Sequence, residues 1–219
     1  MEHRCVVCNA VTEPLIHEKK SVLFHQCPIC QLILRDKSDF FTPDEEKNRY
    51  TLHQNSIDDK GYRDYFLRFF EETQLLKLQS AVPQKGLDFG SGPIPVLAYV
   101  AKQTYNIEMD YYDPFFAPQR VYESKYYDFI TCTEVIEHIP NPLETFALFR
   151  EHLVIGGVVA IMTQLHKNDR DAFFSWFYIR DRSHVAFFSM KTMEYVAKKV
   201  GLEIDYTNNK NIITLKKME

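Results

Sequence analysis

The chain has 219 residues, of which 45% are hydrophobic and 14% aromatic, and its formal net charge at pH 7 is −4. This composition predicts a globular protein with one domain of ordinary size and a small appendage, and the negative charge gives no general attraction to nucleic acid or anionic membranes. No apolar run reaches the roughly 18 residues that span a bilayer, and the polar start MEHRCVVCNA lacks a signal-peptide core, so we expect a cytoplasmic protein without a membrane partner.

Four cysteines near the N-terminus follow the pattern C-x2-C-x18-C-x2-C, whereas Cys132 stands alone in an apolar run. This spacing is typical of a zinc ribbon, in which two knuckles form a tetrahedral four-thiolate site. Two disulfides are the alternative, which a reducing compartment disfavours. Because a closed thiolate shell leaves no position for substrate, we expect a structural Zn²⁺ bound by Cys5, Cys8, Cys27 and Cys30.

Residues 1–50 are therefore assigned to a zinc-ribbon element and its linker. Their acidic and basic residues nearly balance, so this element lacks the basic excess of a nucleic-acid binding surface. After Gly61, aromatic residues recur at helical spacing, which predicts an amphipathic helix in a lid segment, 51–84. The stripe consists of Tyr62, Tyr65, Phe66, Phe69, Phe70 and Leu76.

From residue 85 to residue 219, short apolar strands alternate with helices. The alternation predicts an α/β domain with a parallel sheet covered on both faces, whose ligands bind at the carboxyl ends of the strands. The predicted order is KGLDF (strand), Val96–Thr104 (helix), NIEMDYY (strand), YYDFITCT (strand), Pro142–Leu153 (helix) and GGVVAIMT (strand). Polar residues at the predicted strand ends, expected at one edge, are Asp88, Asp113, Thr133 and Glu134.

Three stretches carry a resemblance to a known family: LDFGSGPIP, YYDP with Asp113, and YDFITCTEVIEHIPNP followed by LVIGGVVAIMT. In order and spacing they resemble the class I S-adenosylmethionine-dependent methyltransferases, from about Gly86 to Lys217. The resemblance is closest to small bacterial members that carry a zinc ribbon ahead of the catalytic domain. It implies a Rossmann-like, mostly parallel sheet of seven strands with an antiparallel last strand, and LEIDYTNNKNIITLKK matches the terminal hairpin.

The resemblance assigns S-adenosylmethionine to the loop after the first strand. Glycines there let backbone N–H groups approach the methionine end of the cofactor, and a helix begins directly afterwards. The carboxylate of Asp113 can accept hydrogen bonds from both ribose hydroxyls, while Pro114 and Phe115 offer a face to the adenine. In the family, the residues closing the fourth strand border the amino group and the transferred methyl. The implied cofactor set is Asp88, Gly90, Ser91, Gly92, Asp113, Pro114, Phe115, Thr133 and Glu134.

Two features depart from the family's pattern. Ile94 and Pro95 replace a further glycine that often follows the Gly-x-Gly. Only residues 114–127 separate the second strand from the next recognised one, which is short for a helix plus a third strand. The acidic residue that usually caps this third strand has only Glu123 as a candidate.

Two other functions are compatible with a Gly-x-Gly loop. A Rossmann dehydrogenase needs G-x-G-x-x-G, but Pro95 occupies the last position, and a carboxylate two residues before Gly90 favours a methyltransferase. The second alternative is a zinc ribbon tethered to a fold that binds the cofactor without catalysis.

The methyl acceptor is defined least well. The N-P-P-Y type signature of many amide and adenine N-methyltransferases is absent, which favours a small molecule. The aromatic stretch 171–189 would line its pocket through Trp176 and Tyr178. His138 and His184 are the candidate general bases, because a histidine titrates near neutrality. A protein or RNA docked through the ribbon is the alternative acceptor, and the oligomeric state is not defined.

Overall fold

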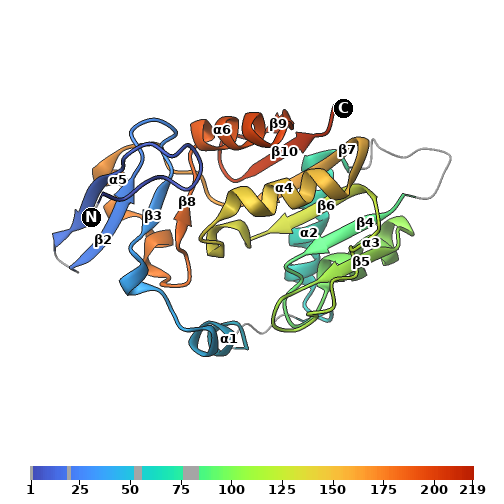
Figure 1. The fold of residues 1–219 in the computed structure, drawn as a ribbon. Helices are drawn as coiled ribbons and strands as arrows, with labels where there is room; N and C mark the ends of the chain where they lie inside the picture. Colours follow the sequence, from blue (N-terminus) through green and yellow to red (C-terminus); the bar gives the residue numbers. More distant parts are fainter. Residues whose placement is uncertain (1, 19–20, 52–55, 76–83) are drawn as a thin grey trace.

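The computed structural model describes residues 2–18, 21–51, 56–75 and 84–219, which form two sheets. The larger sheet has the strand order β5-β4-β6-β7-β10-β9 (Figure 1). β4 (Gly86–Phe89) pairs in parallel with β5 (Met109–Tyr112) and with β6 (Tyr127–Thr133), and β6 pairs in parallel with β7 (Leu153–Met162).

The sheet ends in the predicted hairpin. β10 (Ile212–Lys216) runs antiparallel to β7 and to β9 (Glu203–Thr207). Asn209, between the two hairpin strands, has a φ of +56°, a backbone conformation that asparagine tolerates better than most residues. The α/β class, the mostly parallel sheet and the antiparallel last strand are therefore confirmed.

The described part of this sheet has six strands, one fewer than the seven that the resemblance implies. Residues 113–126 connect β5 to β6 through turns and one isolated bridge, between Asp113 and Ala117. A parallel crossover alone uses a dozen or more residues, so this connection has no room for a helix and a further strand. The expectation of seven strands is corrected to six for this reason.

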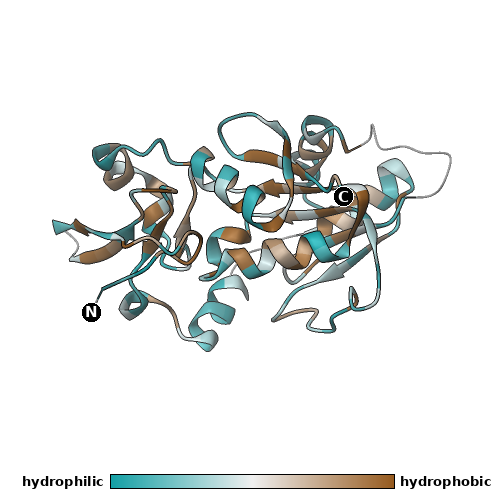
Figure 2. Ribbon diagram, turned by 45° about the horizontal axis from the view of Figure 1, so that its top comes forward, coloured by the Kyte–Doolittle hydropathy of each residue, from teal (hydrophilic) through white to brown (hydrophobic). Residues whose placement is uncertain are grey.

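Helices cover both faces of the larger sheet. α2 (Lys60–Thr73) and α3 (Val96–Tyr105) bury one face, and α4 (Pro142–His152) and α6 (Met190–Val200) bury the other. Figure 2 shows the strands mostly hydrophobic and the helices banded between hydrophobic and hydrophilic, as amphipathic helices on a buried sheet must be. Within the described ranges, no helix is long and apolar enough to cross a membrane.

α2 is the amphipathic helix predicted after Gly61, and much of its stripe is core. Phe66, Phe69 and Phe70 are buried in the cluster that α2 forms with α3 and the sheet. Asp59 caps the N-terminus of this helix, and its side chain accepts a hydrogen bond from the backbone N–H of Tyr62. The predicted stripe residue Leu76 lies outside the described residues, and the domain limits at 51 and 84 stay a prediction.

The smaller sheet has the order β1-β2-β3-β8 and is antiparallel throughout. The N-terminal element supplies three of its strands, and β8 comes from the C-terminal half and lies beside β3 (Figure 1). Residues far beyond the predicted boundary at 50 therefore complete this sheet. Its strands are β1 (Glu13–His17), β2 (Val22–Gln26), β3 (Ile33–Arg35) and β8 (Ala186–Phe187).

Short helices connect these parts of the fold. α1 (Pro43–Thr51) follows the smaller sheet, and α5 (Arg170–Ser175) precedes β8. Single turns of 3₁₀-helix are η2 (Lys37–Asp39), η4 (Ile136–His138) and η5 (Phe177–Arg180).

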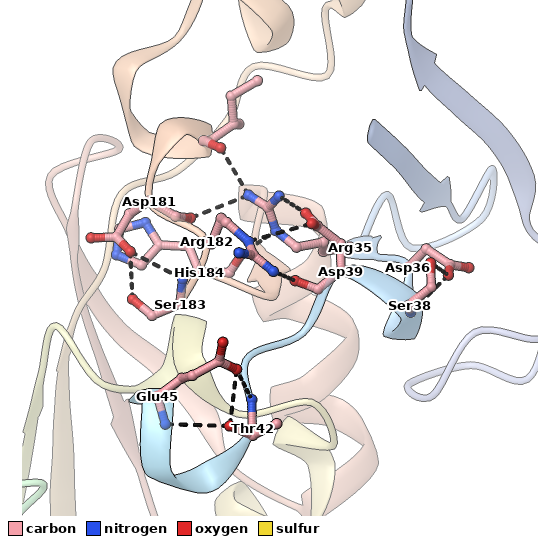
Figure 3. A network of polar contacts seen from close by, with 11 residues as sticks. Arg35, Asp36, Ser38, Asp39, Thr42, Glu45, Asp181, Arg182, Ser183 and His184 are labelled. Carbon is pink, nitrogen blue, oxygen red and sulfur yellow. Dashed lines mark hydrogen bonds and ion pairs between the residues drawn. The ribbon is translucent and has the colours of Figure 1, made fainter. Parts of the chain in front are cut away.

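Arg35, at the end of β3, joins the N-terminal element to the segment that carries His184 (Figure 3). The residue is 3% exposed. Its Nε donates to the carbonyl of His184 at 3.0 Å, and its Nη2 donates to the carbonyls of Ile179 at 2.8 Å and Asp181 at 3.2 Å. Nη1 pairs with the carboxylate of Asp39 at 2.5 Å. One buried guanidinium therefore satisfies three main-chain acceptors and one carboxylate.

Replacing Arg35 with methionine should lower the free energy of unfolding by about 3 kcal/mol, because these acceptors would lose a charged donor in a buried site. Arg180→Met is the matched control, since Arg180 lies in the same segment, is exposed and forms no ion pair among the described residues. Urea unfolding followed by intrinsic fluorescence measures both variants. Equal stability of the two variants would contradict the role given to Arg35.

Candidate active site

A cavity of about 790 Å³ lies at the carboxyl ends of β4, β5 and β6. Its wall also includes Tyr62 and Tyr65 of α2, Tyr50 of α1, and residues of the segment that Arg35 holds. The cavity brings together every residue expected to bind the cofactor and both candidate bases. Those residues are Asp88, Gly90, Ser91, Gly92, Asp113, Pro114, Phe115, Thr133, Glu134, His138 and His184.

The loop after β4 is held against β5 by its own backbone. The N–H groups of Gly90 and Ser91 donate to the carbonyl of Tyr112 at 2.8 and 3.1 Å. Gly90 has a φ of +85°, and a Cβ added there would lie 2.3 Å from a methyl carbon of Val135. Glycine is therefore required at this position by both backbone conformation and space, and the loop presents main chain to the cavity.

Asp113, which follows β5, organises the same loop. Its Oδ2 accepts from the N–H of Gly92 at 3.0 Å, and its Oδ1 accepts from the N–H groups of Phe115 at 2.9 Å and Phe116 at 3.1 Å. A carboxylate offers about four acceptor positions, so roughly one remains for a ligand. The sequence predicts that Asp113 accepts hydrogen bonds from both ribose hydroxyls. This arrangement leaves an acceptor position for roughly one of them.

Asp88 lies on β4, just before the glycine loop, and is only 2% exposed. Its carboxyl accepts a hydrogen bond from Thr131 Oγ1 at 3.0 Å. Burial raises the pKa of Asp88 to about 7, and the nearby charge of Asp113 acts in the same direction. A positive charge bound nearby would lower this pKa again, so Asp88 favours a cationic group in the cavity.

Glu134 directly follows β6 in a left-handed conformation, with a φ of +52°. Such a conformation costs a non-glycine residue free energy and is often found at functional sites. The Glu134 carboxyl accepts from the hydroxyls of Tyr178 at 3.3 Å and Tyr65 at 3.5 Å. Burial and, to a lesser extent, the neighbouring carboxyl of Glu137 together raise the pKa of Glu134 to about 8.

His138 and His184 lie side by side, with their ring centroids 4.9 Å apart. Nδ1 of His138 donates to the carbonyl of Ser183 at 2.9 Å, and Nδ1 of His184 donates to the carbonyl of Tyr178 at 2.8 Å. Because a carbonyl can only accept, these bonds place the proton of each neutral ring on Nδ1 and leave a lone pair on Nε2. Burial lowers the pKa of both histidines, that of His184 to about 4, so both rings are neutral at pH 7.

Tyr178 and Trp176, the two residues predicted to line an acceptor pocket, differ in whether they border a cavity. Tyr178 is 4% exposed and borders a second cavity of about 430 Å³, which shares Glu134 and His184 with the main cavity. Trp176 packs on Tyr178 with ring centroids 4.9 Å apart, adjoins Phe187, and lines neither of these two cavities. The structure therefore gives Trp176 a packing position and Tyr178 a hydrogen-bonding position beneath Glu134.

Sequence reasoning missed two contributions to the site. The sequence predicts a linker in the region of α1, yet Glu46 and Tyr50 line the cavity, and the ring of Tyr50 lies 5.3 Å from that of His138. Glu137 is fully buried beside Glu134. The available signal was the spacing in EVIEH, because residues three apart lie on the same side of a helical turn.

The four N-terminal cysteines converge as predicted, with their sulfur atoms all within 4.8 Å of one another. The Sγ atoms of Cys5 and Cys30 are 3.4 Å apart, and those of Cys8 and Cys27 are 3.3 Å apart. Both separations far exceed the ~2.05 Å of a disulfide, and the thiols are free.

The two cysteine knuckles repeat one backbone geometry. Asn9 and Gln31 each lie four residues after the first cysteine of their pair, with φ values of +61° and +67°. The N–H of Asn9 donates to the carbonyl of Cys5 at 2.9 Å, and that of Gln31 donates to the carbonyl of Cys27 at 3.0 Å. The repeated turn directs both cysteine pairs to one point, as a tetrahedral metal site requires.

Comparison with curated proteins finds relatives that share part of the chain. Ubiquinone biosynthesis O-methyltransferase of Yersinia enterocolitica is 30% identical over 115 residues, which are 52% of this chain and 41% of that protein. The protein of the same name from Photobacterium profundum is 31% identical over 90 residues, which are 41% of this chain and 37% of that protein. The chain thus matches less than half the length of these relatives.

Comparison with solved structures finds the same fold. The plantazolicin methyltransferase BpumL, solved in complex with SAH, has a TM-score of 0.54 at 15% identity and covers 84% of this chain and 93% of its own. An O-methyltransferase family protein from Burkholderia thailandensis has a TM-score of 0.53 at 12% identity, covering 78% and 62%. Identities this low are informative about the fold alone.

A family model described as a methyltransferase domain matches residues 55–207. The match spans more than half of the chain, and the site geometry and the shared fold agree with it. The chain therefore belongs to the methyltransferase domain family and has the Rossmann-like fold of the class I S-adenosylmethionine-dependent methyltransferases.

Proposed function

We propose that this protein transfers a methyl group from S-adenosylmethionine to an oxygen of a small-molecule acceptor. The observation that carries the proposal is that the glycine loop and the pair His138 and His184 line the same cavity, of about 790 Å³. The names of the relatives and of one structural neighbour, all O-methyltransferases, support oxygen as the acceptor atom.

S-adenosylmethionine, when bound, supplies a methyl group on a positively charged sulfur. The N–H groups of Gly90, Ser91 and Gly92 already donate to Tyr112 and Asp113, so the carbonyl groups of this loop would accept from the amino group of the methionine end. The acceptor position left on Asp113 would bind a ribose hydroxyl. Pro114 and Phe115 would flank the adenine, and Thr133 and Glu134 would border the amino group and the methyl.

At the acceptor end of the cavity, the protein would act by positioning the acceptor and by excluding water. Methyl transfer is an in-line displacement on a sulfonium with a good leaving group, so alignment of the acceptor dominates. Tyr50, Tyr62 and Tyr65 supply aromatic walls that limit water. The Nε2 lone pairs of His138 and His184 are available to act on the acceptor hydroxyl.

The reaction class is tested by incubating the protein with S-adenosylmethionine and separated small-molecule and macromolecular fractions of a cell extract. We expect S-adenosylhomocysteine to form with the small-molecule fraction, because the reactive end of the cavity is enclosed by α1, α2 and the segment near His184. Turnover confined to the macromolecular fraction would instead favour a protein or RNA acceptor. Cofactor binding without turnover on either fraction would favour a non-catalytic module, and calorimetric binding of NAD alone would favour a dehydrogenase.

Asp113→Asn should weaken binding of S-adenosylhomocysteine by roughly 10- to 100-fold, because about 1.5–3 kcal/mol of charge-assisted hydrogen bonding is lost while the shape is kept. Isothermal calorimetry measures the dissociation constant. Glu123→Gln is the control, since Glu123 pairs with Arg120 and does not line the cavity. An unchanged dissociation constant for Asp113→Asn would remove Asp113 from the cofactor site.

We further propose that Cys5, Cys8, Cys27 and Cys30 bind one structural Zn²⁺. The support is the convergence of four free thiols within 4.8 Å, a donor set that matches tetrahedral zinc. All four positions would be filled by the protein, so the ion would stabilise the element and would take no part in methyl transfer.

Cys27→Ser should reduce the zinc content below one ion per chain and lower the melting temperature, on the order of 5–10 °C for a loss of a few kcal/mol. Elemental analysis and thermal unfolding measure the two effects. Cys132→Ser is the matched control, because Cys132 is an equally buried free cysteine in β6. Protein that retains its fold and melting temperature without bound metal would contradict the proposal.

A further inference from the structure

Glu137, His138 and His184 form a second group of potential metal ligands, distinct from the four thiols. One ligand atom from each residue lies within 4.8 Å of the others. Glu137 and His138 come from η4, directly after β6, whereas His184 comes from the segment that Arg35 holds. Both histidines line the main cavity, and His184 also lines the smaller one, so the group lies where an acceptor would meet the cofactor.

The two imidazoles are oriented as metal ligands usually are. Nδ1 of each ring donates to a main-chain carbonyl, of Ser183 for His138 and of Tyr178 for His184. Histidines that bind metal almost always donate their other ring N–H to a carbonyl, a carboxylate or water, which fixes the tautomer. Two adjacent rings thus offer unprotonated Nε2 atoms.

Glu137 provides an independent sign of a cation. The residue is fully buried, and its Oε1 accepts from the hydroxyl of Tyr178 at 2.6 Å. Its Oε2 accepts no hydrogen bond from the residues that the structure describes. A buried carboxylate oxygen without a partner costs free energy that a bound cation would recover.

The charges around Glu137 also favour a bound cation. Glu134 lies beside it, and the hydroxyl of Tyr178 contacts both carboxyl groups. Within the described ranges, no lysine or arginine forms an ion pair with Glu134 or Glu137. The buried carboxyl of Glu137 and the half-buried carboxyl of Glu134 therefore share one phenol, and the described residues give neither a counter-charge.

We propose that Glu137, His138 and His184 bind one divalent cation of the Mn²⁺, Fe²⁺, Co²⁺ or Zn²⁺ class at the acceptor end of the cavity. Two imidazoles and one carboxylate form a mixed nitrogen and oxygen donor set that suits these ions, whereas Mg²⁺ and Ca²⁺ prefer oxygen ligands alone. Three protein ligands leave positions open to the cavity, as in catalytic metal sites.

The role of this cation rests on the proposed function. An acceptor hydroxyl bound to the cation becomes more acidic and gives its proton to solvent water. Its oxygen then attacks the methyl carbon, so the O–C bond forms, the C–S bond breaks, and the electron pair stays on the sulfur of S-adenosylhomocysteine. His138 and His184 act here as ligands that hold the cation, in place of general bases.

Titration of the zinc-loaded protein with Mn²⁺, followed by loss of the free-ion electron paramagnetic resonance signal, tests the site. Mn²⁺ avoids thiolates, so the cysteine cluster does not compete for it. We expect about one Mn²⁺ per chain, and a loss of affinity of ~10-fold or more in both His184→Ala and Glu137→Gln. His152→Ala is the matched control, because His152 lies on α4 outside this cluster and should bind Mn²⁺ as the parent does.

This experiment needs neither cofactor nor acceptor, so its result is independent of the proposed methyl transfer. Circular dichroism and thermal unfolding check that each variant is folded, and His184→Ala serves if Glu137→Gln fails to fold. Absence of stoichiometric Mn²⁺ binding, or binding unchanged in a folded His184→Ala variant, would overturn the metal site. Mn²⁺ binding that depends on His184, in a protein that turns over no acceptor, would support the site and count against the proposed function.

Discussion

The parallel pairing of β4 with β5 and β6 is the constraint on which the site depends. In its register Asp88 lies opposite Tyr111 on one side and Thr131 on the other. All three strands therefore end at one edge, and the loop 90–92, Asp113 and Glu134 meet there although the sequence separates them widely. The hydrogen bonds from this loop to Tyr112 and Asp113 then make its main chain a defined wall of the cavity.

The acceptor end depends on a second attachment, between the N-terminal element and the segment before α6. β8 pairs with β3, and Arg35 binds three carbonyls of this segment, including that of His184. Asp181 in turn pairs with Arg49 of α1, whose next residue, Tyr50, contacts the His138 ring. The cysteine-bearing element therefore supports the residues that place His184, which is a different role from that of a detached docking module.

Local sequence signals were sufficient for β4 to β7, for α2, α3 and α4, and for the residues at the cavity edge, because buried parallel strands are continuous apolar runs and the glycine loop follows the first of them. They were insufficient where pairing is long-range: nothing near Ile33 or Leu34 indicates that β3 pairs with Phe187 and Ala186. The resemblance implies a further strand between β5 and β6, but the connection between these strands is too short to contain one. Trp176 packs on Tyr178 and lines neither described cavity, and aromatic content alone does not say which face of a segment meets a cavity.

With the cofactor bound as proposed, the carboxyl groups of the cavity would favour it before methyl transfer over the product afterwards. Burial raises the pKa of Asp88 and of Glu134, so each carboxyl interacts favourably with a positive charge that lowers its pKa again. S-adenosylmethionine carries such charges on its sulfur and its amino group, and methyl transfer removes the one on sulfur. The product would therefore lose an attraction that the reactant had, so the carboxyl groups proposed to bind the cofactor would also favour its exchange after turnover.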